Sequence, residues 1–439
     1  MPERKRYAVV GLGSRSRMFT TAILKEYRDR AELAAFCDVN QTRMDYYNQY
    51  YSQTLDAAPV ATYKPEQFDQ MLEEQRVNTV IVTSIDRTHH RYIIRAMELG
   101  RNVITEKPMT IDAPRCQAIL DTVRATGRNL TVTFNYRYAP RNSKIKELLQ
   151  AGTIGKVLSV HFEWLLDTKH GADYFRRWHR DRHNSGGLMV HKATHHFDLV
   201  NWWLDTQPAT VFAMGDLLFY GRENAEERGM TRFYERAYSR EAAQDDPFAL
   251  HLDRDEALRR MYLEAEHEDG YLRDRSVFGE GISIEDDMSV LVRYQNRAIM
   301  TYHLTAYSPW EGYRVAFNGT KGRLEYEVHE NSYVSGSQKD TNLPELRDAQ
   351  EAVVDEPTSV LIRPQWGKPQ RVGIPGGSEG GHGGGDKRML DAIFVGGSDD
   401  RLGRAADHVA GAMSILTGVA ANKSFATGLP VQVSSLVHF

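Results

Sequence analysis

The stretch "RYAVVGLGSRSRMFTTAILKEY", near the start of the chain, constrains the fold more than any other. It predicts a buried strand, a turn with the pattern Gly11-x-Gly13-x-x-Ser16, and an amphipathic helix. A second strand, "ELAAFCDVN", follows and ends at Asp38. Gly11 permits the tight turn, and Gly13 lets a pyrophosphate approach the backbone at the start of a helix. This order of elements predicts a dinucleotide-binding fold.

The acid at the end of the second strand bears on the choice of cofactor. Asp38 lies 25 positions after Gly13, where a carboxylate accepts hydrogen bonds from the ribose diol of NAD and repels the 2′-phosphate of NADP. Arg43 is near enough in the sequence to bind such a phosphate, so NADP stays an alternative to NAD. Ser16 replaces the third glycine of the pattern, and we expect helix and strand to pack slightly further apart there.

Strands and helices continue to alternate as far as residue 137. Strands are predicted over 78–85, 102–109 and 129–137, and helices over 89–100 and 113–127. Repeated units of this kind favour a doubly wound parallel sheet with ligands at the carboxyl ends of the strands. The residues in the glycine turn or at these ends that we expect to contact the cofactor are Ser14, Arg15, Ser84, His89, Glu106 and Asn135.

The rest of the chain predicts a second α/β domain. Alternating apolar positions predict strands over 155–166, 209–219, 287–296, 298–307 and 313–328, with hairpin turns at 295–297 and 319–322. We therefore expect a nucleotide-binding domain over 1–137 and a substrate-binding and oligomerisation domain over 138–439. A highly charged helical insertion is expected at about 221–280. A final helix over about 404–421 is expected to pack against the sheet or the first domain.

Composition excludes several classes of partner. The formal charge is −4 and no basic block recurs, so nucleic acid is an unexpected partner. No apolar run approaches the roughly 20 residues of a membrane span. We expect no signal peptide, since no long apolar region precedes the first strand. Cys37 and Cys116 lie inside periodic segments, so a disulfide framework is not expected. Together these features indicate a cytoplasmic protein.

The stretch "GGLMVHKATHHFDLVNWW", residues 186–203, predicts a buried helix that nevertheless carries several titratable groups. On one helix, His191, His195 and Asp198 share a face, and Lys192 neighbours His195. We therefore expect one stripe of this helix to line a cavity. His196 is expected to be structural.

Three segments, "VVGLGSR", "TEKPMT" and "SGGLMVHKATHHFDLVNWWL", together resemble the Gfo/Idh/MocA oxidoreductase family. The resemblance extends over nearly the whole chain. It implies an N-terminal nicotinamide-binding Rossmann domain and a C-terminal domain with a large, open, mostly antiparallel sheet. It also implies a sugar, sugar derivative or cyclitol as substrate, a homodimer or homotetramer that shares one face of that sheet, and a cis bond before Pro108.

The same resemblance suggests catalytic roles. Lys107, beside the nicotinamide, would hydrogen-bond the reacting oxygen and stabilise its negative charge. His195 matches the family's histidine and would act as general base, and Asp198 matches the aspartate three positions further on and would bind the substrate. His191 stands where the family usually has an acid, which leaves Lys192 as a second candidate electrophile. A buried structural role is the alternative for each histidine, and a surface lysine the alternative for Lys107.

Several further residues are candidates for the substrate-binding wall. Aromatic and guanidinium groups stack on sugar faces and bond sugar hydroxyls. The candidates are Arg177, Trp178 and His179 before the helix, Tyr307, Trp310 and Glu311 at a strand end, and His382 in the glycine-rich stretch 373–386. A solvated basic loop and a flexible linker are the respective alternatives for 174–187 and 373–386. Asp386 is expected to cap the helix that follows it.

Other functions were weighed against this interpretation. A zinc site formed by His191, His195, His382 and Asp386 has legitimate ligands, but we expect no metal. We expect an NAD(P)-dependent oxidoreductase acting on a sugar or cyclitol hydroxyl. A redox-neutral glycosidase with tightly bound NAD is the alternative, and a sensor that holds NAD without turnover is the third hypothesis.

Overall fold

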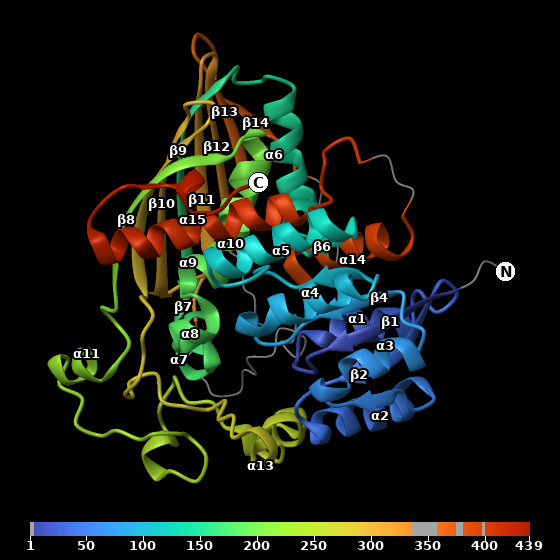
Figure 1. The fold of residues 1–439 in the computed structure, drawn as a ribbon. Helices are drawn as coiled ribbons and strands as arrows, with labels where there is room; N and C mark the ends of the chain where they lie inside the picture. Colours follow the sequence, from blue (N-terminus) through green and yellow to red (C-terminus); the bar gives the residue numbers. More distant parts are fainter. Residues whose placement is uncertain (1–3, 335–357, 375–380, 397–399) are drawn as a thin grey trace.

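The computed structural model describes residues 4–334, 358–374, 381–396 and 400–439, which form two sheets (Figure 1). The first sheet is parallel throughout and has the strand order β3-β2-β1-β4-β5-β6. Its strands are β1 (Lys5–Val10), β2 (Ala31–Cys37), β3 (Ala61–Tyr63), β4 (Thr79–Val82), β5 (Asn102–Thr105) and β6 (Leu130–Val132). This order confirms the doubly wound parallel sheet predicted for the first domain.

Helices connect these strands and begin where the sequence supplies caps. They are α1 (Ser16–Leu24), α2 (Gln41–Leu55), α3 (Phe68–Glu74), α4 (His89–Glu98) and α5 (Ala113–Thr126). Asn40 caps α2 and Asp112 caps α5, each accepting a backbone hydrogen bond three residues on. Gly127, in the left-handed conformation, ends α5. Cys37 and Cys116 are both free and buried, as expected.

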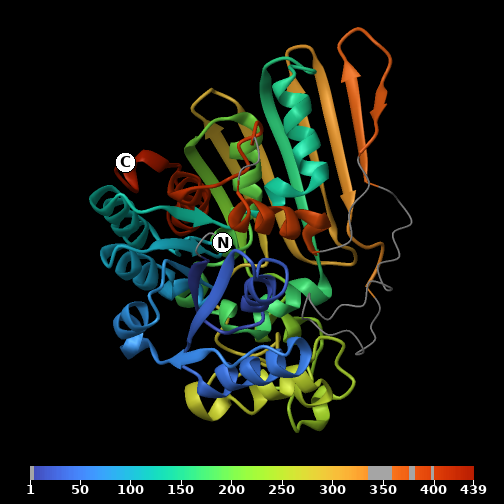
Figure 2. The same ribbon diagram turned by 90° about the vertical axis from the view of Figure 1, so that its right-hand side faces the viewer.

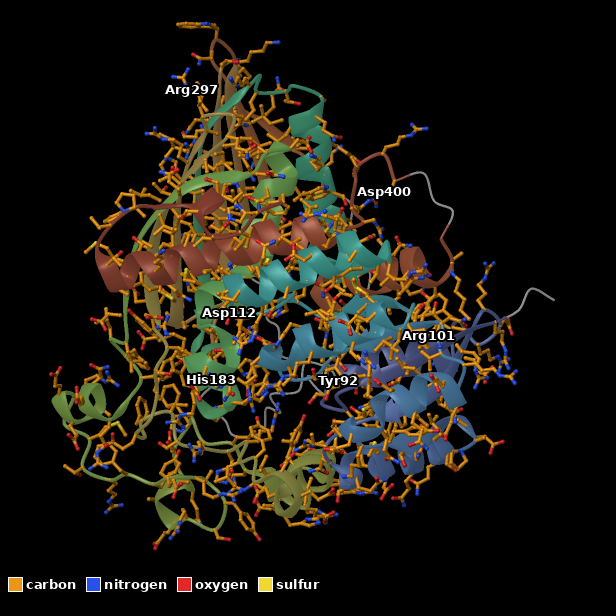
Figure 3. All side chains as sticks on the ribbon, viewed as in Figure 1. Tyr92, Arg101, Asp112, His183, Arg297 and Asp400 are labelled. Atoms are coloured by element: carbon orange, nitrogen blue, oxygen red, sulfur yellow. The ribbon has the colours of Figure 1, made fainter. Side chains whose placement is uncertain are left out.

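The second sheet is mixed but mostly antiparallel, with the order β14-β13-β12-β11-β7-β10-β9-β8-β15. Only β7 and β10 pair in parallel among these neighbours. The strands are β7 (Val157–Asp167), β8 (Pro208–Asp216), β9 (Asp287–Tyr294), β10 (Ile299–Ser308), β11 (Gly312–Gly319), β12 (Gly322–His329), β13 (Ser359–Pro364), β14 (Gln370–Val372) and β15 (Val431–Gln432). Both predicted hairpins are confirmed, and Arg297 marks one of them at the far tip of the sheet (Figure 3).

Helices cover one face of this sheet and separate it from the first domain (Figure 2). They are α6 (Pro140–Gln150), α7 (Thr168–Arg176), α8 (Arg182–Ser185), α9 (Leu188–His191), α10 (Thr194–Leu204), α14 (Gly381–Phe394) and α15 (His408–Thr427). Helix α15 approaches both domains closely. A Cβ on Gly418 would lie 2.2 Å from the carbonyl oxygen of Met189, and one on Gly411 would lie 2.8 Å from Val132 of β6. Only glycine allows this packing.

Three expectations about local structure are corrected. The stretch 186–203 forms two helices, because the hydrogen bonding tightens at Lys192 and Ala193, where the amide of His196 bonds the carbonyl of Ala193. Asp386 lies inside α14 rather than at its start, since the helix begins at Gly381. The insertion at 221–280 forms only short helical pieces joined by irregular segments.

The helical pieces of this insertion are short, and they reach the first domain. They are α11 (Arg222–Glu227), α12 (Glu256–Leu258), the π-helical turn η7 (Arg259–Leu263) and α13 (Glu266–Asp269). Figures 1 and 2 both show α13 beside α2, although some 225 residues separate Asn40 from Ala265, whose carbonyl bonds the Asn40 side chain. Among the described residues, no helix is both long and apolar enough to cross a membrane.

Candidate active site

The glycine turn has the geometry that a dinucleotide needs. Gly11 has a φ of +88°, and a Cβ there would lie 2.3 Å from Cα of Ser84, so β1 and β4 meet in a way that only glycine permits. Beside Gly13 there is room, since the nearest atom to an added Cβ is the Tyr262 hydroxyl at 4.0 Å. The turn therefore fits a pyrophosphate at the start of α1.

Asp38 lies at the end of β2, as predicted. Its carboxylate accepts hydrogen bonds from the backbone N–H groups of Leu12 (2.5 Å) and Asn40 (2.8 Å). Burial raises the pKa of Asp38, while Arg43 and these two hydrogen bonds act against that rise. Arg43 is itself held by the insertion, because its Nη1 lies 2.7 Å from Asp269 and 3.9 Å from Asp38.

The insertion covers the predicted nucleotide site. The Tyr262 hydroxyl accepts a hydrogen bond from the Ser14 backbone at 3.1 Å and bonds its Oγ at 2.6 Å. Glu268 accepts from the backbone of Gln41 (2.6 Å) and Thr42 (2.7 Å) at the start of α2, which the helix dipole favours. No sequence motif marks Tyr262 or Glu268, so sequence reasoning missed both.

Lys107 follows β5, and the Lys107–Pro108 peptide bond is cis. Burial lowers the pKa of Lys107, and the like charge of Lys192 lowers it further, to about 8. The preceding Glu106 binds Arg15 at 2.8 Å. Arg15 in turn lies 3.7 Å from Asp386 of α14, which also accepts from the side-chain amide of Asn135 at 2.6 Å. Arg15 of the glycine turn and Glu106 and Asn135 at strand ends thus meet in one polar network around Asp386.

His191 pairs with an acid from the other domain. Its Nδ1 lies 2.5 Å from a carboxylate oxygen of Asp86, which begins the short helix η2 (Asp86–Thr88) after β4. Burial raises the pKa of Asp86 and lowers that of His191 well below its usual value, and both shifts favour the uncharged groups. Sequence reasoning missed Asp86, although its place directly after the strand predicted over 78–85 is a signal.

Lys192 and His195 lie against aromatic rings. The ammonium of Lys192 is 5.1 Å from the ring centre of Trp164, and Lys192 is 4% exposed. The His195 ring meets Tyr136 edge-on at 4.7 Å. The neighbouring His196 stacks on Trp164 at 3.8 Å inside the core, which agrees with the structural role expected of it.

The segment before α9 brings aromatic rings to His191. His179 lies 4.2 Å from the His191 ring and stacks on Trp178 at 3.6 Å. Tyr174 meets the His191 ring edge-on at 5.5 Å, and its hydroxyl is 3.0 Å from Nε2 of His170. His170 Nδ1 is 2.8 Å from Glu311. Hydrogen bonds thus link Glu311 through His170 to Tyr174, whose ring contacts that of His191. Sequence reasoning missed Tyr174 and His170.

Other candidates have partners away from this cluster. Asp198 accepts two hydrogen bonds from Arg137 at 2.8 and 2.6 Å, and both side chains are buried. The His89 ring bonds the carbonyls of Pro108 and Ser84, and the Ser84 hydroxyl bonds Thr88. Both Tyr307, which bonds Asp287 and stacks on Phe219, and Trp310, which stacks on His329, face other parts of the second domain. The side chain of His382 lies outside the described residues.

These placements change the set of candidates. Asp198 has the geometry of a structural ion pair, so we leave it out of the substrate-binding set. We also omit Tyr307 and Trp310. Within the described residues, no three His, Cys, Asp or Glu side chains gather as a metal site would require. His183, labelled on α8 in Figure 3, lies near the junction of the two domains but joins none of these contacts.

The fold and the site define a two-domain oxidoreductase with a dinucleotide-binding domain. A family model described as "Oxidoreductase family, NAD-binding Rossmann fold" matches residues 5–134. A second, described as "Oxidoreductase family, C-terminal alpha/beta domain", matches residues 146–433. The chain therefore belongs to the Gfo/Idh/MocA oxidoreductase family.

Curated relatives support this assignment. YteT of Bacillus subtilis (strain 168), named only as an oxidoreductase, is 35% identical over 448 residues, which cover 98% of each chain. The scyllo-inositol 2-dehydrogenase (NAD(+)) of the same bacterium is 26% identical over 157 residues, or 34% of this chain and 42% of that protein.

Solved structures share the fold. Aldose-aldose oxidoreductase from Caulobacter crescentus superposes with a TM-score of 0.60 at 16% identity, covering 98% of this chain and 100% of that one. An oxidoreductase from Agrobacterium radiobacter, in complex with NAD+, L-tartaric acid and magnesium, gives 0.62 at 14% identity and covers 99% and 100%. At these identities the likeness concerns the fold alone.

Proposed function

We propose that this protein transfers a hydride between NAD and a hydroxyl-bearing carbon of a sugar, sugar derivative or cyclitol. One observation carries the proposal. Lys107, at the end of a strand of the dinucleotide-binding sheet, lies close enough to Lys192 of the second domain for each charge to affect the other. A substrate held between these domains would meet ammonium groups, a histidine and the cofactor together. The names of curated relatives, several of them inositol dehydrogenases, support this substrate class.

The residues of this chain divide the work as follows. Lys107 hydrogen-bonds the reacting oxygen and stabilises its developing charge. His195 removes the hydroxyl proton. Bound NAD would serve as the hydride acceptor. Trp178 and His179 stack against one face of the sugar. The pair of His191 and Asp86 is the second candidate base, because it is a neutral imidazole beside a carboxyl group.

Cofactor binding rests on the turn and on two strand ends. Gly11, Gly13 and Ser14 hold the pyrophosphate, and Asp38 accepts hydrogen bonds from the ribose. NAD is favoured over NADP because Asp38 repels a 2′-phosphate, and because Asp269 and Met261 already occupy Arg43. Arg15, Glu106 and Asn135 fix the loops around the nicotinamide end.

A redox-neutral glycosidase is the second candidate, and one feature favours it. The insertion bonds both the glycine turn and the start of α2, which suits a cofactor that stays bound through every turnover. Such an enzyme would oxidise a ring carbon, eliminate the aglycone, add water and reduce the carbon again.

The test is absorbance at the reduced-nicotinamide band during incubation with free sugars, cyclitols and aryl glycosides, with and without added NAD. Accumulating NADH with a free sugar or cyclitol supports the dehydrogenase. Aglycone release without net NADH, and dependent on bound NAD, supports the glycosidase. If NAD is bound but no compound of the panel yields NADH or a released aglycone, both proposed functions are contradicted. Comparing His195→Asn with His191→Asn then identifies the base, because only loss of the base removes the acid limb of the pH profile of kcat.

A further inference from the structure

Arg273, in the insertion, is a buried cation with no acceptor. Its side chain is 2% exposed, and among the described residues it makes no hydrogen bond or ion pair. Its guanidinium carbon lies 4.3 Å from the centre of the Tyr262 ring, which leaves the N–H donors unused. A buried guanidinium without an acceptor is costly, because the desolvation of its charge is not offset. Such a group indicates a ligand that brings negative charge.

A second guanidinium, that of Arg177, also lies near enough to Tyr262 to affect its pKa. Arg177 donates to Asp173 at 2.5 Å, while its Nε has no partner among the described residues. Burial would raise the pKa of Asp173, but Arg177, Arg273 and Arg176 together lower it to about 2. Arg177 and Arg176 thus lie within 4 Å of this one carboxylate, and Arg273 is near enough to affect its pKa without forming an ion pair with it. Arg176 donates through Nη1 to the carbonyl of Phe248, whereas Arg273 has no such bond among the described residues.

The pKa of Tyr262 agrees with a positive environment around its ring. Burial raises the pKa of most buried tyrosines, as it does to about 12 for Tyr51. At Tyr262 burial also raises the pKa, yet Arg273 and Arg177, helped by the Ser14 hydrogen bond and Arg43, lower it below its usual value.

This positive region borders the proposed reaction centre. Burial lowers the pKa of His179 well below its usual value, and His191, Arg177, Lys107 and Arg273 lower it further. The positive charges of Lys107 and Arg177 also act on Asp86, the partner of His191, and partly offset the rise in its pKa that burial causes. Arg177 directly follows α7 in the second domain and precedes Trp178 and His179, whose rings stack on each other near His191. The Tyr262 hydroxyl, by contrast, bonds Ser14 of the glycine turn.

We propose that Arg273 and Arg177 form an anion subsite for a carboxylate group of the substrate, which makes the substrate an acidic sugar of the hexuronate class. The inference rests on the proposed function, since it puts the carboxylate beside the hydroxyl that would be oxidised. Guanidinium groups suit this task because their fixed fork of donors matches a carboxylate. A neutral sugar would leave Arg273 buried without a counter-charge.

The test compares ligands that differ only at C6. Glucuronate is measured against glucose, and galacturonate against galactose, by calorimetric titration of the NAD-loaded protein. We expect at least one hexuronate to bind about tenfold to a hundredfold more tightly than its neutral hexose, the factor for a hydrogen bond to a charged group. Arg273→Gln should abolish that preference, and Arg273→Lys should keep part of it.

Controls separate this from loss of folding or of cofactor. Arg275→Gln, two positions away with a side chain 41% exposed, should leave the preference intact. The dissociation constant of NADH should change less than about twofold in Arg273→Gln, and thermal denaturation should show that this variant folds. If Arg273→Gln fails to fold, the same comparison is made with Arg177→Gln.

Equal binding of hexuronates and hexoses by the unaltered protein overturns the proposal. A large loss of NADH affinity in Arg273→Gln also overturns it, because the guanidinium would then face the pyrophosphate. The outcome for the proposed function is distinct. Tight binding of a hexuronate with no NADH formed would uphold the subsite and contradict the dehydrogenase, whereas NADH formed equally from neutral sugars would do the reverse.

Discussion

At the scale of single residues, the charge on Lys107 depends on its neighbours. Burial and the like charge of Lys192 bring its pKa to about 8, so the ammonium prevails below that pH and the neutral amine above it. An ammonium is the form that stabilises an oxyanion. Activity should therefore fall as the pH rises through about 8.

Lys192→Met tests this coupling. Removing the like charge raises the pKa of Lys107, so the alkaline limb of the pH profile of kcat should move upward by roughly one pH unit. The readout is the position of the limb rather than the rate, which separates it from any direct role of Lys192. An unmoved limb would mean that another group governs it.

Lys107→Met should lower kcat by a factor on the order of 10² to 10⁴ while NADH still binds.

The ion pair of Asp198 and Arg137 gives a prediction about stability. Asp198→Ala leaves a guanidinium buried without its partner, so the free energy of unfolding should fall by about 3–5 kcal/mol. The KM for substrate should stay unchanged, since Asp198 is occupied by Arg137. Asp121→Ala, at an exposed pair with Arg124, should cost less than about 1 kcal/mol. A raised KM with unchanged stability in Asp198→Ala would return Asp198 to the substrate-binding set.

At the scale of elements, the insertion is the part of the fold that acts on the cofactor. Tyr262→Phe removes both hydrogen bonds to Ser14 and should loosen the insertion over the glycine turn. Release of NADH, followed by stopped-flow fluorescence, should become about tenfold faster. Tyr238→Phe, at an exposed position of the same insertion, is the matched control. Unchanged or slower release in Tyr262→Phe would show that the insertion does not retain the cofactor.

Elements also explain which parts could be predicted from the sequence. Gly11, Asp38 and Glu106 stand at strand ends, and period and spacing along the chain reveal such ends. The contacts of Asp86 with His191, of Tyr262 with Ser14 and of Arg273 with Tyr262 join distant segments, and no local pattern encodes them. Helix periodicity also predicted a single helix over 186–203 where the structure has two, because periodicity cannot reveal the tightened turn at Lys192.

At the scale of the whole molecule, the second sheet leaves one face uncovered. Leu291, Ile299 and Met214 are exposed there by 47%, 45% and 70%, and Leu291 pairs directly with Phe212 on the next strand. An exposed apolar face on a broad sheet suits self-association. We therefore propose that two or four copies of the chain associate through this face.

Leu291→Glu tests this assembly. A charge on this face should shift the molar mass measured by light scattering to that of one chain. Val395→Glu, at a site of similar exposure (45%) just after α14, should leave the mass unchanged. A single-chain mass for the unaltered protein would contradict the proposed assembly.

The central claim is that hydride moves between substrate carbon and cofactor, and isotope transfer tests it most directly. NAD-loaded protein is incubated with ring-deuterated forms of any sugar, cyclitol or hexuronate that it converts or binds. The cofactor is then extracted, and its mass is measured by mass spectrometry. We predict that the cofactor gains a single deuterium atom, and that Lys107→Met slows this labelling. Conversion of substrate with a cofactor that stays unlabelled would contradict the account.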